Sequence, residues 1–261
     1  MGSGRPWIVF VVSVLAIRTY GLKADGFTAF RSDGKAPVVA SLPTNEKMRV
    51  DIYYETLCPD CQELIGKKLL AIWNDPAFRA ALDIHLHPSG NVEVTGEGDA
   101  REITCQHGEA ECYGNALHAC AMKVMAQEDY MPVIMCMEAA HPSSVDSLNL
   151  ALTSCATAQN VSSERVQACM ADKQVNTMML GHYQDTEALK PPHEWVPWVL
   201  LDGQHERHAD MGKLRDTICK RFEESGDGTQ LTACRAVGLT DVSQANPVGA
   251  SEPCYAKPMA K

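Results

Sequence analysis

Two cysteines, Cys58 and Cys61, are separated by two residues in the stretch YYETLCPDCQEL, residues 53–64. Such a pair can exchange electrons with a disulfide, because the thiolate of the first cysteine attacks a sulfur atom and the second cysteine resolves the mixed disulfide. Random placement of 11 cysteines in 261 residues yields about 0.5 pairs at this spacing. The spacing alone therefore does not separate chemistry from coincidence, and the surrounding elements must decide.

The residues around the pair have the periodicities of a strand–helix–strand unit. MRVDIYY, residues 48–54, alternates as a strand does; CPDCQELIGKKLLAIW, residues 58–73, has helical spacing; and ALDIHLHP, residues 81–88, alternates again. Pro59 suits the first position of the helix, because it has no N–H group to leave unpaired there. In a strand–helix–strand setting, a C-x-x-C pair is typical of redox enzymes.

This placement predicts different roles for the two sulfur atoms. Cys58 is expected at the helix N-terminus, where the N–H groups and the helix dipole stabilise a thiolate. Cys61 is one turn further along and is expected to be more buried. The negative charge of Asp60 disfavours the thiolate and therefore favours a reductant over a strong oxidant. We predict that Cys58 attacks, that Cys61 resolves, and that Pro59 and Asp60 tune the pair.

Zinc binding is the alternative for the two cysteines, and it requires two further ligands. The sequence has no second C-x-x-C pair. His85 and His87 alternate along the second strand on the face opposite its apolar residues, a pattern that is usual for solvated histidines. We therefore expect no metal. No G-x-G-x-x-G motif occurs in the right setting either, so we expect no bound cofactor and an external thiol as the reductant.

The remainder of the chain completes an α/β fold. A polar, Gly-rich stretch at 89–99 predicts a loop, and residues 105–190 are mostly helical in pattern. Residues 196–201 predict a strand, Asp202-Gly203 a hairpin turn into a short strand at 205–207, and residues 211–222 a last helix with Met211 on its apolar stripe. This order predicts a thioredoxin-like core (βαβ…ββα) with a disulfide-stapled helical insertion.

Val196-Pro197 opens the strand that follows the insertion. Proline is tolerated at the first residue of a strand. In a thioredoxin-like core this position faces the C-x-x-C pair, and a cis bond there leaves a backbone edge for an extended peptide. An ordinary trans proline is the alternative. We predict a cis bond and a substrate-binding role for Val196 and Pro197.

Composition and the chain ends indicate the compartment. Arg5 followed by an apolar run at 7–17 predicts a signal peptide, residues 1–24, with a short membrane anchor as the alternative. A linker (25–47), the thioredoxin-like domain (48–222, with its insertion at about 105–190) and a tail (223–261) follow, and no other segment could cross a membrane. Eleven cysteines and the sequon at Asn160 suit a glycoprotein in an oxidising compartment, and the net charge of −10 argues against nucleic acid as a partner.

The stretch CQHGEAECYGNALHAC, residues 105–120, carries a more specific signal. It resembles the C-Q-H-G-x2-E-C-x2-N-x4-C signature of the gamma-interferon-inducible lysosomal thiol reductase family at every fixed position. CPDC and PPHEWVPWV are also similar to that family, and the resemblance covers roughly residues 48–234. It implies a soluble thiol reductase of endosomes and lysosomes that acts on protein disulfides at acidic pH through Cys58 and Cys61. A secreted protein is the alternative location.

The other cysteines are expected to form structural disulfides whose pairing the sequence does not assign. If Cys112 and Cys120 share a helix, they lie about 12 Å apart and each needs a partner elsewhere. Cys219 and Cys234 could join the last helix to the chain after it, and Cys254 remains as the odd thiol. The structural set comprises Cys105, Cys112, Cys120, Cys136, Cys155, Cys169, Cys219 and Cys234.

The polar residues of the signature are expected to support the disulfides that staple the helical insertion. Gln106, His107, Glu111 and Asn115 could cap the helix or hydrogen-bond around it. A protonated His107 near Cys58 would also help its thiolate.

These observations favour a thiol–disulfide oxidoreductase that reduces protein disulfides in the secretory or endolysosomal pathway with a small thiol as donor. A disulfide oxidase or isomerase is one alternative. A secreted, disulfide-stapled binding protein with a structural C-x-x-C is another.

Overall fold

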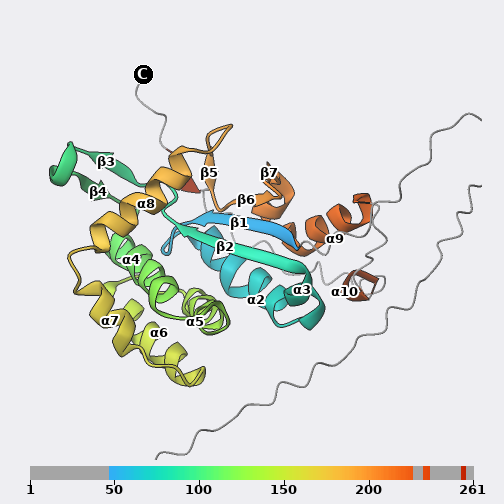
Figure 1. The fold of residues 1–261 in the computed structure, drawn as a ribbon, viewed down its shortest axis with the longest axis horizontal. Helices are drawn as coiled ribbons and strands as arrows, with labels where there is room; N and C mark the ends of the chain where they lie inside the picture. The colour runs from blue at the N-terminus through green and yellow to red at the C-terminus, as the bar shows by residue number, and fades with distance from the viewer. Residues whose placement is uncertain (1–46, 226–231, 236–253, 257–261) are drawn as a thin grey trace, which may run out of the picture. The chain divides into compact units, whose positions relative to one another are not determined.

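The central feature of the computed structural model, which describes residues 47–225, 232–235 and 254–256, is a four-stranded sheet (Figure 1). β1 (Met48–Tyr54) runs parallel to β2 (Leu82–Pro88) and antiparallel to β6 (Trp198–Leu201), and β7 (Gln204–His205) pairs with β6, giving the order β2-β1-β6-β7. Val50 lies opposite Ile84 on one side and Leu201 on the other. The strand–helix–strand and strand–strand–helix halves predicted from the sequence are thus confirmed.

The helix after β1 is less regular than its spacing predicts. It consists of α1 (Pro59–Glu63), a π-helical segment (Leu64–Leu69) and α2 (Leu70–Trp73). A further short helix, α3 (Pro76–Ala81), begins where the side chain of Asp75 accepts the N–H of Ala77. π-Helical segments inside helices are frequent near functional sites, and this one follows the C-x-x-C pair directly. Sequence periodicity does not distinguish this π-helical segment from an α-helix, because the apolar residues still fall on one face.

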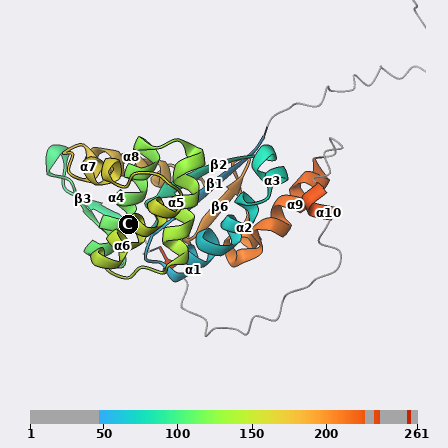
Figure 2. The ribbon, with the colours of Figure 1, turned by 90° about the horizontal axis from the view of Figure 1, so that it is seen from below.

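The helical insertion is present between the two halves of the core. Its members are α4 (Glu109–Val124), α5 (Gln127–Ala139), α6 (Val145–Ala158), α7 (Glu164–Met170) and α8 (Val175–Glu187). Figures 1 and 2 show these helices gathered as one group, away from the C-terminal helices. α5 packs against the π-helical segment, and α4 and α8 contact β2. The insertion therefore supports the first helix of the core.

The C-terminal part of the fold departs from the expected apolar stripe. A π-helical turn (Ala209–Lys213) precedes α9 (Leu214–Glu224), and Met211 in that turn is 70 % exposed. Gly212 adopts a φ of 81°, which interrupts the helical path and turns Met211 outward. Leu214 and Ile218 are buried as predicted.

Two small sheets were not expected. β3 (Glu93–Thr95) and β4 (Glu102–Thr104) form a hairpin around a 3₁₀ turn (Gly98–Ala100), where the sequence predicts a loop. β5 (Trp195–Val196) pairs with β8 (Cys254–Tyr255). Pro197 therefore separates two strands of different sheets instead of opening one continuous strand. The predicted tail also contains structure, namely β8 and a short helix, α10 (Thr232–Arg235).

The predicted signal peptide and all but the last residue of the linker lie outside the described residues. Among the described helices, none combines the length and the apolar character needed to cross a bilayer. Asn160 is exposed after the end of α6, where a glycan could be attached.

Candidate active site

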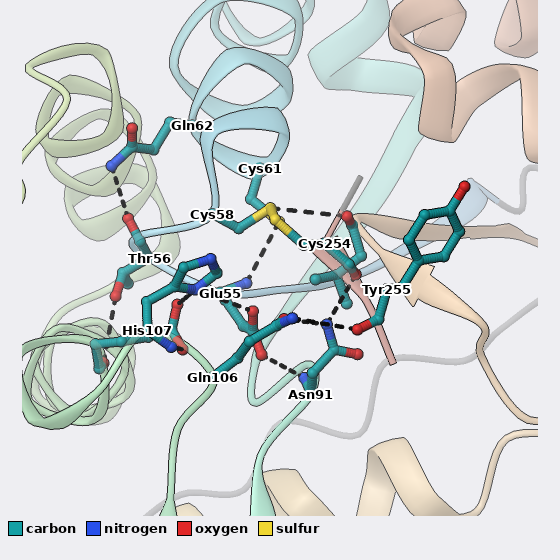
Figure 3. Close-up of a disulfide and its surroundings, with 12 residues drawn as sticks. Glu55, Thr56, Cys58, Cys61, Gln62, Asn91, Gln106, His107, Cys254 and Tyr255 are labelled. Atoms are coloured by element: carbon teal, nitrogen blue, oxygen red, sulfur yellow. Dashed lines mark hydrogen bonds and ion pairs between the residues drawn. A yellow bond between two sulfur atoms is a disulfide. The ribbon is translucent and has the colours of Figure 1, made fainter. Parts of the chain in front are cut away.

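Cys58 and Cys61 lie where β1 passes into the first helix (Figure 3). Cys58 is the N-cap residue of α1, Pro59 is its first helical residue, and the carbonyl of Cys58 accepts the N–H of Gln62 at 3.0 Å. Cys61 is buried one turn further along, and its Sγ accepts the N–H of Glu55 at 3.5 Å. This is the strand-to-helix junction that the sequence predicts for the pair.

Cys58 is bonded to Cys254 in the structure, and Cys61 is a free thiol (Figure 3). Two expectations are therefore wrong for this state of the chain. Cys254 is not the odd thiol, and Cys61 is not more buried than Cys58, because both have 0 % of their surface exposed. The reason is that β8 lies against the active site and brings the Cα atoms of Cys58 and Cys254 to within 6.3 Å, a normal separation for a disulfide.

Val196 and Pro197 lie beside the pair, as predicted. Their peptide bond is cis. The carbonyl oxygen of Val196 is 3.7 Å from Sγ of Cys58, and Val196 is the register partner of Cys254. Asp210 fixes the residues around them, since its carboxylate accepts the N–H of Val199 at 2.7 Å and the indole N–H of Trp195 at 3.0 Å.

The signature residues form a small closed loop next to the site. Cys105 bonds to Cys112, so the partner that Cys112 needs in place of Cys120 lies just before the same helix. The pairing is possible because Cys105 precedes α4 and the chain turns at Gly108, which has a φ of 84°. Cys120 does pair with a distant helix, as expected. The remaining bonds are Cys120–Cys169, Cys136–Cys155 and Cys219–Cys234.

Two buried carboxyl groups lie beside His107, namely Glu111 of this loop and Glu55, which follows β1. Glu111 accepts the backbone N–H of His107 at 3.0 Å, and its other oxygen is 2.5 Å from Nδ1 of the same histidine. Nδ1 of His107 is also 3.7 Å from Glu55, whose second oxygen accepts the N–H of Asn91 at 2.5 Å. Asn115 supports the turn before Cys58, because its side-chain oxygen accepts the N–H of Thr56 at 3.0 Å. Glu111, His107 and Asn115 thus stabilise the loop and the turn before Cys58. The contacts described for the His107 side chain are to the carboxyl groups of Glu111 and Glu55, not to the thiol of Cys58.

Burial sets the ionisation of the groups around Cys61. Burial, followed by the nearby Glu111, raises the pKa of Glu55 well above its usual value. Burial also raises the pKa of the Cys61 thiol, and Glu55, Glu138 and Glu111 add to the effect when they are ionised. Cys61 is therefore held as a neutral thiol.

Asn91 and Gln106 are site residues that sequence reasoning missed or assigned differently. Asn91, which was part of a predicted loop, donates its side-chain N–H to the carbonyl of Cys254 at 2.8 Å. Gln106 donates to the carbonyl of Tyr255 at 3.2 Å, and its oxygen accepts from Asn91 at 2.7 Å (Figure 3). The only sequence signal was that Gln106 belongs to the signature.

Two groups of side chains in the described part of the chain have donor atoms close enough to share an ion. His87, His182 and Asp185 form one, and Glu55, His107 and Glu111 form the other. Neither contains a cysteine of the C-x-x-C pair. His85 instead contacts Asp83 at 2.8 Å, and His87 contacts Asp51 at 3.0 Å.

A groove of about 770 Å³ lies along the Val196–Pro197 side of the site. Apolar side chains of Trp195, Met211 and Tyr255 line it, together with charged residues that include Asp60 and Arg207. Its volume and mixed lining suit a segment of peptide.

Comparisons with known proteins agree with this geometry. Residues 49–159 match the family model for gamma interferon inducible lysosomal thiol reductase (GILT). The chain is 33% identical to the gamma-interferon-inducible lysosomal thiol reductase of Mus musculus over 184 residues, covering 70% of the chain and 71% of that protein. It is 35% identical to the Carassius auratus protein of the same name, covering 71% of each. Among solved structures it resembles Chlamydia trachomatis DsbA with a TM-score of 0.50 and 10% identity, covering 71% of this chain and 97% of that one.

Proposed function

The chain belongs to the gamma-interferon-inducible lysosomal thiol reductase family, and from this premise we propose that it reduces disulfide bonds of other proteins through Cys58 and Cys61. Family membership makes it a thiol–disulfide oxidoreductase. The observation that carries the assignment of the residues is the position of Cys58. It begins a helix directly after β1, lies 3.7 Å from the carbonyl of Val196, and has the free thiol of Cys61 one turn away.

In the proposed reaction, the Cys58 thiolate attacks one sulfur of a substrate disulfide. The substrate S–S bond breaks, one substrate sulfur leaves as a thiolate, and the other forms a mixed disulfide with Cys58. Cys61 then attacks Sγ of Cys58, releases the second substrate sulfur and forms the Cys58–Cys61 bond. The substrate gains two electrons and two protons, which the two thiols of the chain lose.

The surroundings of the two thiols support this order of events. The positive end of the dipole of the helical run Pro59–Trp73 favours negative charge at Cys58. Burial raises the pKa of Cys61, so this thiol favours its protonated form and does not compete with Cys58 for the first attack. The raised pKa of Glu55 keeps that carboxyl neutral in mildly acidic solution, where it does not oppose the ionisation of Cys61.

We propose proteins with accessible disulfides as substrates and a small thiol as the electron donor. The groove beside Val196 and Pro197 supports a peptide substrate. The chain carries no dinucleotide-binding motif, so an external thiol would regenerate the pair by the same exchange chemistry. The names of the relatives, the five disulfides and the exposed sequon at Asn160 support an endolysosomal or extracellular location.

An insulin reduction assay from acidic to neutral pH, with a small thiol as donor, tests the proposal. Cys58→Ser should abolish turnover, and Cys61→Ser should stop turnover while a mixed disulfide between Cys58 and insulin accumulates. The control replaces both Cys219 and Cys234, whose disulfide joins α9 to α10 outside the site, and should retain activity. Full activity of Cys58→Ser would contradict the proposal, and a wild-type chain that does not accelerate reduction beyond the small thiol alone would favour a binding protein with a structural C-x-x-C. A reduction potential near that of a strong oxidant, about −120 mV, would favour a disulfide oxidase instead.

A further inference from the structure

We propose that Cys254 is a third redox cysteine of this chain, and that the segment Cys254–Ala256 is a tethered substrate that occupies the peptide site and leaves it by disulfide exchange. The inference rests on the proposed function of Cys58 and Cys61 and extends it to the way in which a substrate peptide is bound. Cys254 is separated from Cys58 by 196 residues and lies outside the part of the chain that resembles the family signature.

The backbone of the segment is bound as an added strand. β8 pairs antiparallel with β5, so that Cys254 lies opposite Val196 and Tyr255 opposite Trp195. The N–H of Ala256 donates to the carbonyl of Glu194 at 2.9 Å, which continues the ladder past the strand. Strand addition of this kind is a common mode of peptide recognition, because main-chain hydrogen bonds supply affinity without demanding particular side chains.

Two side-chain amides bind the carbonyl groups of the same segment. Asn91 donates to the carbonyl of Cys254 at 2.8 Å, and Gln106 donates to the carbonyl of Tyr255 at 3.2 Å (Figure 3). Asn91 is itself held in place, since its amide oxygen is 3.1 Å from Nε2 of His193 and its side-chain N–H also reaches Gln106. These donors come from the loop after β2 and from the signature. Together with β5, three separate regions of the chain therefore converge on this short segment.

The burial of the segment differs between its residues in a way that suits a substrate site. Cys254 is 4 % exposed and enclosed with Cys58, whereas the side chain after it, Tyr255, is 57 % exposed at the edge of the groove. The site therefore encloses the cysteine and its main chain and leaves the next side chain largely in solvent. We infer that the enzyme takes a cysteine in an extended segment and places little restriction on the residue that follows it.

The exchange needs no additional oxidant or reductant. The thiolate of Cys61 attacks Sγ of Cys58, the Cys58–Cys254 bond breaks, and a Cys58–Cys61 bond forms. Cys254 leaves as a thiolate and takes up a proton equivalent to the one that Cys61 lost. The chain has one disulfide and one thiol among these three cysteines before and after the step, so the two forms are isomers of equal oxidation state. Reduction by an external thiol then opens the site to a substrate.

Peptide mapping of the full-length chain, alkylated in acid without reductant and digested with trypsin, tests the bond. Peptides 50–67 and 236–261 contain Cys58 with Cys61 and Cys254, respectively. Both should appear cross-linked in Cys61→Ser, which cannot exchange, and in a fraction of the wild-type chain. In Cys254→Ser the cross-link should be absent. A wild-type chain and a Cys61→Ser chain that both lack the cross-link would overturn the proposal.

Kinetics provide the second, independent measurement. A tethered peptide competes with substrate at an effective concentration that is set by its connection to the chain. Cys254→Ser should therefore lower the KM for a peptide disulfide several-fold, while the variant lacking both Cys219 and Cys234 keeps the wild-type KM. An unchanged KM in Cys254→Ser would overturn the tethered-substrate inference. The proposed reductase function would still stand in that case, because it is tested separately by the insulin assay with Cys58→Ser.

Discussion

Two identical side chains in one turn of helix are both buried but have different neighbours. Sγ of Cys58 lies at the start of the helix and near the carbonyl of Val196, whereas Cys61 is buried among carboxyl groups that raise its pKa. We expect this difference to order the chemistry, because the helix start stabilises a thiolate whereas burial opposes one. Asp60 stands between the two and brings a charge of the same sign as the thiolate.

Asp60→His should raise the reduction potential of the Cys58–Cys61 pair. Removing a negative charge and adding a positive one stabilises the Cys58 thiolate, and a more stable reduced form is a stronger oxidant. The measurement is a redox titration against glutathione in the Cys254→Ser background, so that only the pair titrates. Asp60→Asn is the matched control and should give an intermediate potential. An unchanged or lower potential in Asp60→His would contradict this account.

At the scale of elements, the helical insertion holds the active-site helix in place from one side. The π-helical segment approaches the end of α5 so closely that a Cβ atom at Gly66 would lie 2.5 Å from the backbone nitrogen of Ala139. Disulfides join α4 to α7 and α5 to α6, so the insertion is cross-linked within itself. The first helix of the core thus packs on a rigid support.

Gly66→Ala should destabilise the protein by about 1–3 kcal/mol, because the added methyl group must push two backbones apart. Urea unfolding under non-reducing conditions measures the change. Gly181→Ala in α8 is the matched control, since a Cβ atom there meets nothing within 4 Å. The control should be neutral or stabilising by up to about 1 kcal/mol, as expected for replacing glycine in a helix. Equal stability of the two variants would refute the close-approach argument.

Removal of the Cys120–Cys169 bond by alanine at both positions should lower the free energy of unfolding by about 4 kcal/mol. The bond closes a loop with a sequence separation of 49, so it restricts the unfolded chain strongly. The same change at Cys219 and Cys234, separated by 15, should cause a loss of about 3 kcal/mol. Non-reducing denaturation of both variants measures the two losses, and the reverse ranking would argue against loop closure as the main cause.

For the molecule as a whole, a row of three buried polar side chains runs from the central strand into the insertion. The hydroxyl of Tyr54 in β1 lies 2.9 Å from Nδ1 of His118 in α4, and Nε2 of that histidine lies 3.6 Å from Glu138 in α5. Burial lowers the pKa of His118 to about 3, so the imidazole is neutral. Burial, followed by Glu111, raises the pKa of Glu138 well above its usual value. The folded chain is therefore more stable when the carboxyl group of Glu138 is protonated.

Stability should consequently fall as the pH rises above about 4.5, the usual pKa of a glutamate, until the pKa of folded Glu138 is reached. In this window the unfolded chain releases the proton and the folded chain keeps it, so each pH unit removes up to about 1.4 kcal/mol. Glu138→Gln imitates the protonated carboxyl and lacks this loss. Urea unfolding at several pH values should show that the free energy of unfolding of the variant rises relative to that of the wild type as the pH increases.

Glu128→Gln, an exposed position on the same helix, is the matched control for this measurement. His118 titrates in the opposite sense, because its neutral form is lost from the unfolded chain below about pH 6.5. That contribution is present in the wild type and in both variants, so it cancels in the comparison. A stability difference between Glu138→Gln and the wild type that is independent of pH would contradict the raised pKa.

The amino-acid sequence by itself determined the features that depend on neighbours along the chain. The alternation of MRVDIYY, Pro59 at the first turn and Pro197 near the last strands locate the C-x-x-C pair and the proline that faces it. The spacing of apolar residues likewise predicts the helical insertion. These signals are local, because a strand or a helix expresses its periodicity within a few residues.

Only the tertiary structure decided which groups meet at the site. Cys58 bonds to Cys254 because the packed backbone brings residues that are 196 positions apart to a Cα separation of 6.3 Å, and many pairings of the cysteines were compatible with the sequence. Asn91 and Gln106 become peptide-binding residues because two loops converge beside β8. The protonation of Glu138 depends on burial by several helices at once. Distances and burial between remote segments arise only when the chain is packed, so no local pattern encodes them.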